Sequence, residues 1–323
     1  MKRVLALRPE SHEPHPIHRE GRIWTETNCY VDLWVELLHA LGHDPVASLA
    51  FTLAIDFEGD QWTFFKFPLA DLHALYGLDV QELAIWRPLA AHVEEQVGRG
   101  RPVLVEVDAW FLPDTAGTSY RREHWKTTVA VTEIDLERRH MGYFHNRGYY
   151  HVAGEDFEHL LRLRGADDAR MLAPYVEFVK VAPGIATRPS LRDASMALLR
   201  SHLRRAPTEN PFRRFRARLE DDLAWLAKSD LDAFHKYSFA TLRQYGACFE
   251  LAQTFLQWLA AEGERGMDVP IAAFGALAQA AKVFQFQLAR AVSRRTAMDL
   301  APVDAMAGRW EEGIGALRAR FSR

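Results

Sequence analysis

Residues 24–42 of the chain, WTETNCYVDLWVELLHALG, carry the clearest signal of fold and chemistry in the sequence. Polar residues able to cap a helix come first, and from Cys29 apolar residues recur at helical spacing as far as Leu41. Gly42 then supplies a typical helix end. The stretch therefore predicts a helix over about residues 29–41 whose first turn contains a cysteine.

The position of Cys29 matters for its chemistry. Backbone N–H groups in the first turn of a helix lack partners within the helix, and the macrodipole is positive there, so negative charge is favoured. Because the thiolate is the nucleophilic form, we expect Cys29 to be the reactive thiol. The alternative is that Cys29 is a small core residue. Cys248 lies inside a longer helical pattern without such a setting, and we expect it to be structural.

The sequence around this helix indicates an α+β domain. Short β-rich runs alternate with a few helices up to about residue 182, without a glycine-rich dinucleotide turn or a phosphate-binding loop. A helix followed by mostly antiparallel strands is the order of an α+β fold. The strands 52–57 and 62–67 flank a turn and predict a hairpin. The other predicted strands are 4–7, 103–108, 127–134, 141–144 and 175–181, with a helix at about 88–97.

The second half of the chain has a different pattern. Pro183, Gly184 and Pro189 mark a boundary after which the strand pattern disappears. Short connections between long helices favour antiparallel neighbours, so we expect an all-α helical bundle. The predicted domains are 1–185 (α+β) and 186–323 (bundle). The predicted helices cover residues 191–203, a segment starting at Asn210, 231–262, 270–294 and 302–321.

Composition excludes several classes of function. The formal net charge is −3, whereas binding to phosphates draws on an excess of Lys and Arg, so no nucleic-acid partner is expected. No uninterrupted apolar run reaches the roughly 18 residues of a membrane helix, and the N-terminus turns polar too early for a signal peptide. Two cysteines in 323 residues cannot form a disulfide framework. These features predict a cytoplasmic protein without a membrane partner.

A nucleophilic cysteine needs a base within hydrogen-bond reach and a group that orients the base. His124 is the best candidate for the base, because it stands at the entrance to the predicted strand 127–134. Asn146 follows a later strand and is able to bond the second imidazole nitrogen, and His145 is the neighbouring alternative. The alternative interpretation of His124 is an ordinary surface histidine.

Other polar clusters are less specific. The loop at residues 113–120 precedes His124, and we expect Tyr120 and Arg121 at its end to line a substrate pocket. The acidic turn at 56–61 is typical of a solvated hairpin tip. The histidines of the N-terminal loop lack Cys or Glu partners at ligand spacing, so neither a metal nor a cofactor is expected. These histidines are His12, His15 and His18.

The order of these features resembles the papain-like fold over about residues 20–165. A cysteine at a helix start is followed by the strand GRPVLVEVD (100–108), a histidine before a strand, and a strand that ends in a polar pair. More narrowly, the chain resembles the bacteriocin-processing cysteine peptidases and the N-terminal domain of the butirosin-biosynthesis acyltransferase. The whole chain also resembles a bacterial family of unknown function. The resemblance implies Cys29 as nucleophile, His124 as general base and Asn146 as the orienting residue.

Two departures from the peptidase pattern bear on the reaction. The processing peptidases have Asp-Pro where this chain has His145 and Asn146, although Cys-His-Asn is also a papain-like arrangement. The upstream glutamine of the oxyanion hole is missing, and Asn28 or backbone N–H groups would have to replace it. Both departures disfavour peptide hydrolysis more than chemistry on an activated thioester.

The expected function is therefore a cysteine-dependent acyltransferase. It would move an acyl or aminoacyl group from a carrier-protein or coenzyme A thioester, through a thioester on Cys29, to a small amine. The alternatives are a cysteine hydrolase or peptidase, and a non-catalytic scaffold that binds a carrier protein or a metabolite. A transferase must hold its acceptor, so we expect the helical half to supply one cleft wall, with aromatic residues of 234–239 and Tyr245. The alternative is that these aromatics are core of the bundle.

Overall fold

The computed structural model describes residues 1–19, 21–25, 28–164, 172–181 and 190–321. The chain divides into two compact units, each built from separate segments. The first unit contains Met1–Arg19, Asn28–Pro45 and Leu72–Thr187. The second contains Glu20–Thr27, Val46–Asp71 and Arg188–Arg323, so it takes two segments from the N-terminal half. The sequence division at residue 185 stays a prediction for the domain boundaries.

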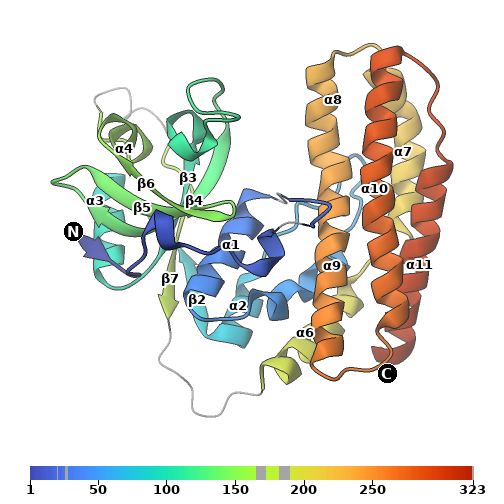
Figure 1. Cartoon of the computed structure of the whole chain (residues 1–323), viewed down its shortest axis with the longest axis horizontal. Coiled ribbons are helices and arrows are strands. Elements are labelled where there is room, and N and C mark those ends of the chain that lie inside the picture. The colour runs from blue at the N-terminus through green and yellow to red at the C-terminus, as the bar shows by residue number, and fades with distance from the viewer. Residues whose placement is uncertain (20, 26–27, 165–171, 182–189, 322–323) are drawn as a thin grey trace. The chain divides into compact units, whose positions relative to one another are not determined.

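The first unit is built on one antiparallel sheet (Figure 1). Its strand order is β2-β7-β3-β4-β5-β6, and the short β1 pairs with β4. The mixed architecture with an antiparallel sheet is compatible with the expected α+β class, and the strands predicted near 103–108, 127–134, 141–144 and 175–181 are confirmed. The strands are β1 Lys2–Arg3, β2 Leu78–Glu82, β3 Val103–Asp108, β4 Lys126–Asp135, β5 His140–His145, β6 Gly148–Ala153 and β7 Val176–Val181.

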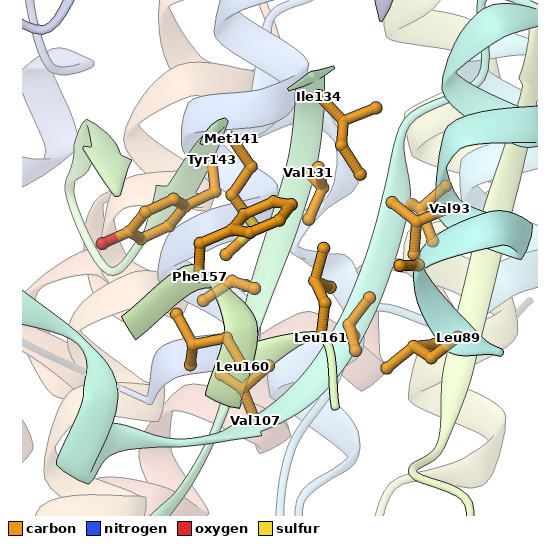
Figure 2. Packing of buried hydrophobic residues seen from close by; sticks show 14 of the residues in the cluster. Leu89, Val93, Val107, Val131, Ile134, Met141, Tyr143, Phe157, Leu160 and Leu161 are labelled. Atoms are coloured by element: carbon orange, nitrogen blue, oxygen red, sulfur yellow. The ribbon is translucent and has the colours of Figure 1, made fainter. Parts of the chain in front are cut away.

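Helices cover the sheet of the first unit. Helix α1 (Cys29–Ala40) packs on β4 and β5, and α3 (Leu89–Gly98) packs on β3 and β4. Alternate residues of each strand point to opposite faces. One face therefore buries aliphatic side chains such as Val105 and Val131 against α3 and α4 (Glu155–Leu160) (Figure 2). This apolar layer packs on β3 and β4, the strands beside the candidate site. Short 3₁₀ turns connect these elements in the described part of the unit: η1 Pro9–Ser11, η2 Pro16–His18, η4 Ala109–Phe111 and η5 Pro113–Thr115.

The second unit is dominated by long helices. Helix α10 packs along α9 and α11, and α11 also packs against α7 (Figure 1). The Asn210 side chain caps α7 through the backbone N–H of Phe212, and Ser190 caps α6 through Asp193, as their sequence positions predict. The helices of this unit are α6 Leu191–Arg205, α7 Pro211–Leu226, α8 Leu231–Ser238, the π-helical η6 Phe239–Arg243, α9 Gln244–Ala261, α10 Asp268–Arg294 and α11 Ala301–Phe321. Helix α2 (Leu69–Tyr76) begins in a segment of the second unit and ends in a segment of the first.

Three of the predicted strands are wrong. Residues 52–57 and 62–67 do not form a two-stranded hairpin, because only the isolated bridge between Phe57 and Trp62 pairs them. The preceding segment forms the 3₁₀ helix η3, Pro45–Ala54. The segment is apolar at nearly every position, and such a run does not distinguish strand from helix by periodicity. The strand predicted at 4–7 is also displaced, since β1 covers Lys2–Arg3.

The core of the second unit accounts for two residues singled out in the sequence. Tyr245 is fully buried, and its ring contacts those of Trp62 and Phe212. Its expected place in a cleft wall is therefore wrong, and the alternative of a core residue is confirmed. Cys248 is fully buried with Sγ 3.3 Å from the carbonyl oxygen of Thr52, and burial raises the pKa of its thiol. Cys248 is thus a structural thiol, as expected.

Within the described part of the chain, α10 is the one helix long and apolar enough to cross a membrane by length and composition. Its buried side chains, such as Phe274 and Phe284, belong to the core of the second unit. A core helix passes the same test, so this composition is compatible with a soluble protein.

Candidate active site

Cys29 is the first residue of α1, as the sequence predicts. The Asn28 side chain caps this helix, because its Oδ1 accepts a hydrogen bond from the Val31 backbone N–H at 2.8 Å. Cys29 is partly exposed. As the first residue of the helix, it lies close to the positive end of the helix macrodipole. Asn28 is buried, and its Oδ1 already accepts the hydrogen bond that caps the helix. If Asn28 contributes to an oxyanion hole, the donor would therefore be its Nδ2.

His124 forms a dyad with Asp108, an aspartate that is not among the residues predicted from the sequence. Nδ1 of His124 lies 2.6 Å from Oδ2 of Asp108, the last residue of β3. The imidazole also stacks on the indole of Trp110, with ring centroids 4.4 Å apart and planes 8° apart. Oδ1 of Asp108 accepts a hydrogen bond from the Trp110 backbone N–H at 3.0 Å. The His124–Asp108 dyad therefore has a fixed carboxylate and a fixed ring plane.

This geometry is that of an oriented general base. Nδ1–H donates to the carboxylate, which leaves the lone pair of Nε2 free to accept a proton. The His124 side chain is 67% exposed, so a substrate can reach it. The carboxylate also stabilises the imidazolium that forms after proton transfer.

A cavity of about 570 Å³ lies beside the dyad, entirely within the first unit. This volume is typical of a small-molecule site. Its lining mixes apolar and aromatic side chains with a few charged ones, which is the composition expected of such a site. The lining residues are Glu106, Val107, Asp108, Phe111, His124, Trp125, Lys126, His159, Leu160, Arg162 and Pro174.

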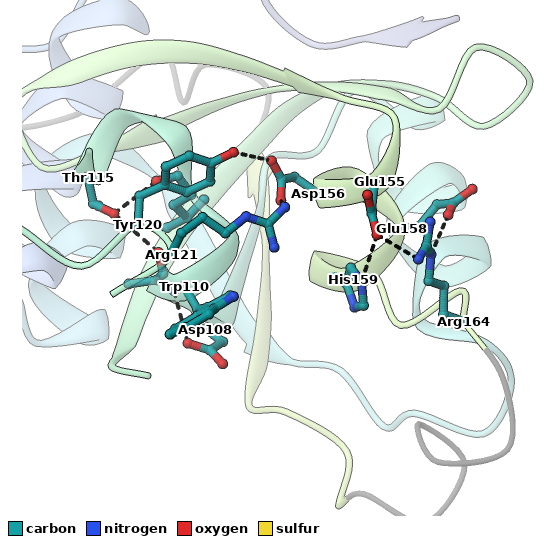
Figure 3. Close-up of polar contacts among 12 residues, drawn as sticks. Asp108, Trp110, Thr115, Tyr120, Arg121, Glu155, Asp156, Glu158, His159 and Arg164 are labelled. Carbon is teal, nitrogen blue, oxygen red and sulfur yellow. Dashed lines mark hydrogen bonds and ion pairs between the residues drawn. The ribbon is translucent and has the colours of Figure 1, made fainter. Parts of the chain in front are cut away.

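Helix α4 forms one side of this cavity. Oδ2 of Asp156 accepts a hydrogen bond from Tyr120 at 2.8 Å, and Oδ1 pairs with Arg121 Nη2 at 2.5 Å (Figure 3). The ring of His159 stacks on Phe111 at a centroid distance of 4.2 Å. Tyr120 and Arg121 thus anchor α4 beside the cavity, and their predicted contact with substrate stays a prediction.

His145 and Asn146 lie away from the dyad contacts. His145 is buried, with Nδ1 2.6 Å from Oδ2 of Asp114 and Nε2 2.8 Å from Oγ1 of Thr127. Both of its ring nitrogens are therefore engaged within the fold. Asn146 occupies the turn between β5 and β6 with a φ of 48°, a left-handed conformation that asparagine tolerates better than most residues. The contact at His124 Nδ1 comes from Asp108, and the orienting role expected of Asn146 stays a prediction.

Pairing register relates Cys29 to the dyad. Tyr30, next to Cys29, donates from its hydroxyl to Glu177 at 2.8 Å, and Glu177 lies opposite Leu104 on β3. Leu104 and Asp108 are four residues apart on β3 and so point to the same sheet face. The first turn of α1 and Asp108 therefore share one face. Among the residues that the structure describes, no hydrogen bond or ion pair joins Cys29 to His124.

The histidines of the N-terminal loop find acidic partners on α1. His12 Nε2 and His18 Nδ1 lie 2.9 and 2.5 Å from the two oxygens of Glu36. His18 Nε2 lies 3.2 Å from Asp32 Oδ1. Burial alone would lower the pKa of His18, but the hydrogen bonds to Asp32 and Glu36 outweigh it and raise the pKa to about 9. A protonated His18 between two buried carboxylates thus ties the loop to α1.

Two family models match the chain, one in each half of the sequence. The family model of the DUF1839 N-terminal domain matches residues 13–181, and that of the DUF1839 C-terminal domain matches residues 188–319. The chain belongs to the DUF1839 family. This is a family of unknown function, in line with one of the resemblances drawn from the sequence. No curated protein matches this DUF1839 chain at a significant level.

The sequence pattern did not indicate Asp108, the residue that completes the dyad with His124. It ends the run VLVEVD, and only the β3–β4 register brings it beside the segment that leads into β4. An acidic residue that closes an apolar strand, two residues before the aromatic Trp110, is a signal that could have indicated it.

Proposed function

We propose that the first unit is a cysteine-dependent acyltransferase with Cys29 as nucleophile and the His124–Asp108 dyad as general base. The observation that carries the proposal is the dyad itself, an imidazole held by a carboxylate at 2.6 Å beside a cavity of ligand size. Cys29, at the capped start of α1 on the same sheet face as Asp108, supports the choice of nucleophile.

The reaction would proceed in two steps. His124 Nε2 takes the thiol proton, Cys29 Sγ attacks the carbonyl carbon of a donor thioester, and the donor thiol leaves with the proton returned by His124. An amine then attacks the acyl-cysteine, His124 accepts the amine proton, and Cys29 leaves as the thiolate, which recovers the proton. Substrate binding must bring Cys29 and His124 within hydrogen-bond reach, since catalytic contacts are often long without substrate.

The fold proposed for this unit is papain-like. A cysteine at a helix start, a covering antiparallel sheet and a histidine leading into a strand support that proposal. The orienting residue departs from the expected pattern, because Asp108 precedes His124 in the chain whereas Asn146 follows it. The relation to the butirosin acyltransferase and the bacteriocin-processing peptidases rests on the sequence pattern alone.

The donor would be a carrier-protein or coenzyme A thioester and the acceptor a small amine. Lys126 and Arg162 on the cavity lining offer positive charge for the phosphate that both donors carry, although Lys126 also pairs with Glu106 at 2.7 Å. No metal or cofactor takes part in the proposed steps. A hydrolase with the same residues is the alternative, and it would release free acid without an acceptor.

Intact-protein mass spectrometry with a panel of acyl-coenzyme A and acyl-carrier-protein thioesters tests the proposal. We expect one acyl adduct on the wild-type chain, none on Cys29→Ser, and an unchanged adduct on the matched variant Cys248→Ser. Addition of an amine panel should discharge the adduct as amide, whereas amine-independent discharge to free acid would indicate a hydrolase. An adduct that survives Cys29→Ser would contradict the choice of nucleophile.

A further inference from the structure

A second cluster of ligating side chains lies on the sheet of the first unit, at the opposite end of β4 from Lys126. It comprises Glu133 of β4, His140 of β5 and His151 of β6, with one ligand atom of each within 4.8 Å of the others. The cluster contains none of the residues of the proposed active site.

The strand register explains why these residues meet. Glu133 lies opposite Gly142, and Gly142 lies opposite His151, so the three positions form one row across β4, β5 and β6. His140 is two residues before Gly142 on β5 and therefore points to the same face. A side chain at position 142 would collide, because its Cβ would lie 2.1 Å from the Tyr149 hydroxyl oxygen and 3.2 Å from the Glu133 Cβ. Glycine thus lets the flanking ligands approach across β5.

The geometry of Glu133 fits a ligand. Its side chain is 2% exposed, and its Oε2 pairs with Arg3 Nε at 2.5 Å. Its Oε1 faces His140 Nδ1 at 3.7 Å, which is too long for a hydrogen bond. Two ligands that each lie about 2.1 Å from a tetrahedral ion are about 3.4 Å apart, close to this gap. Arg3 would hold the carboxylate in place, as outer-shell partners of metal ligands do.

We propose that Glu133, His140 and His151 bind a divalent transition-metal ion, with Zn²⁺ the best match. Two imidazoles and one carboxylate are a donor set suited to this borderline class of ion, and a water molecule would complete the tetrahedron. Exposure rises from the buried Glu133 through the partly exposed His140 to the exposed His151, so an ion can enter from solvent.

Isothermal titration of the full chain with Zn²⁺ tests the site. We expect one equivalent bound by the wild-type chain and at least tenfold weaker binding in His140→Ala and in His151→Ala. His73→Ala removes an exposed histidine of α2 and is the matched control; it should bind as the wild type does. Cys29→Ser should also retain the site, which separates this inference from the proposed active site.

Thermal unfolding provides a second measurement. Zn²⁺ should raise the Tm of the wild-type chain and of His73→Ala but not that of the double variant His140→Ala/His151→Ala, because an ion stabilises only the state that binds it. These histidines are exposed or partly exposed, so the variants are expected to fold. A wild-type chain that binds no Zn²⁺, or a double variant that binds it with unchanged affinity, would overturn the proposal.

Discussion

Asp108→Asn is the most informative single change in the proposed active site. The carboxylate accepts the Nδ1–H of His124 at 2.6 Å, and this fixes the tautomer that leaves Nε2 as the base. An amide of the same shape offers a donor as well as an acceptor, so it favours the wrong tautomer in a fraction of molecules and no longer stabilises the imidazolium.

The magnitude follows from the exposure of the pair. Two unit charges about 4 Å apart interact by about 1 kcal/mol in water and about 4 kcal/mol near a protein surface. Asp108 is 37% exposed and His124 67% exposed, so a value in the lower half of this range applies. With about 1.4 kcal/mol for each factor of ten, and a further loss from the tautomer, kcat/KM should fall about 10- to 100-fold.

The assay is acyl transfer under single-turnover conditions, with far-ultraviolet circular dichroism to check the fold. Asp114→Asn is the matched control, because Asp114 also pairs with a histidine at 2.6 Å but lies outside the cavity lining. It should reduce the free energy of unfolding, since the pair is buried, and leave the chemical step nearly unchanged. Equal rates for the wild type and Asp108→Asn would refute the role of the dyad.

Three further predictions concern stability and thiol reactivity. The pKa of His18 is raised to about 9, above the ordinary value of 6.5, so its contribution to the free energy of unfolding should be complete below about pH 6.5 and fall as the pH passes through 9. Urea unfolding of the wild type and of His18→Gln between pH 6 and 10 measures this contribution. Parallel curves of unfolding free energy against pH for the two proteins would contradict the prediction. Gly246→Ala should destabilise the chain by about 1–3 kcal/mol, because a Cβ there would lie 2.3 Å from the Trp24 ring. Gly308→Ala is the control: a Cβ there would have nothing within 4 Å, so the change should be neutral or stabilising. Calorimetry of the two variants measures the difference. Limited iodoacetamide should alkylate Cys29 before the buried Cys248, and peptide mapping that finds Cys248 labelled first would reverse the assignment of the reactive thiol.

Local sequence signals predicted the elements that have strong periodicity or clear caps. β3 was predicted with its observed bounds because VLVEV alternates branched side chains, and α7 because Asn210 and Pro211 form a recognisable helix start. The edge strand β2 was missed, since it is exposed at its last two positions and lacks a buried run. The hairpin predicted for residues 52–67 is wrong because the apolar residues of the 45–67 segment pack against helices distant in the sequence. Phe57, for example, packs on Phe215 of α7.

In the candidate site, too, local sequence signals predict some features and contacts between distant residues determine others. Cys29 was placed at a helix start from neighbouring residues alone, which the structure bears out. The partners of its histidines depend on register and packing. Asp108 meets His124 only through the pairing of β3 with β4, and Glu36 receives His12 and His18 only when the N-terminal loop folds back on α1. The partners in such contacts are set by strand register and packing, so the local sequence pattern alone does not identify them.

The central claim is that Cys29 and His124 act as a nucleophile–base pair. The pH dependence of Cys29 alkylation by iodoacetamide, followed in a Cys248→Ser background, measures it directly. If the imidazole assists ionisation of the thiol, His124→Ala should slow alkylation near pH 6.5 at least tenfold, while His145→Ala, whose ring nitrogens both bind within the fold, should leave the rate nearly unchanged. Identical alkylation profiles for the parent chain and His124→Ala would contradict the pairing.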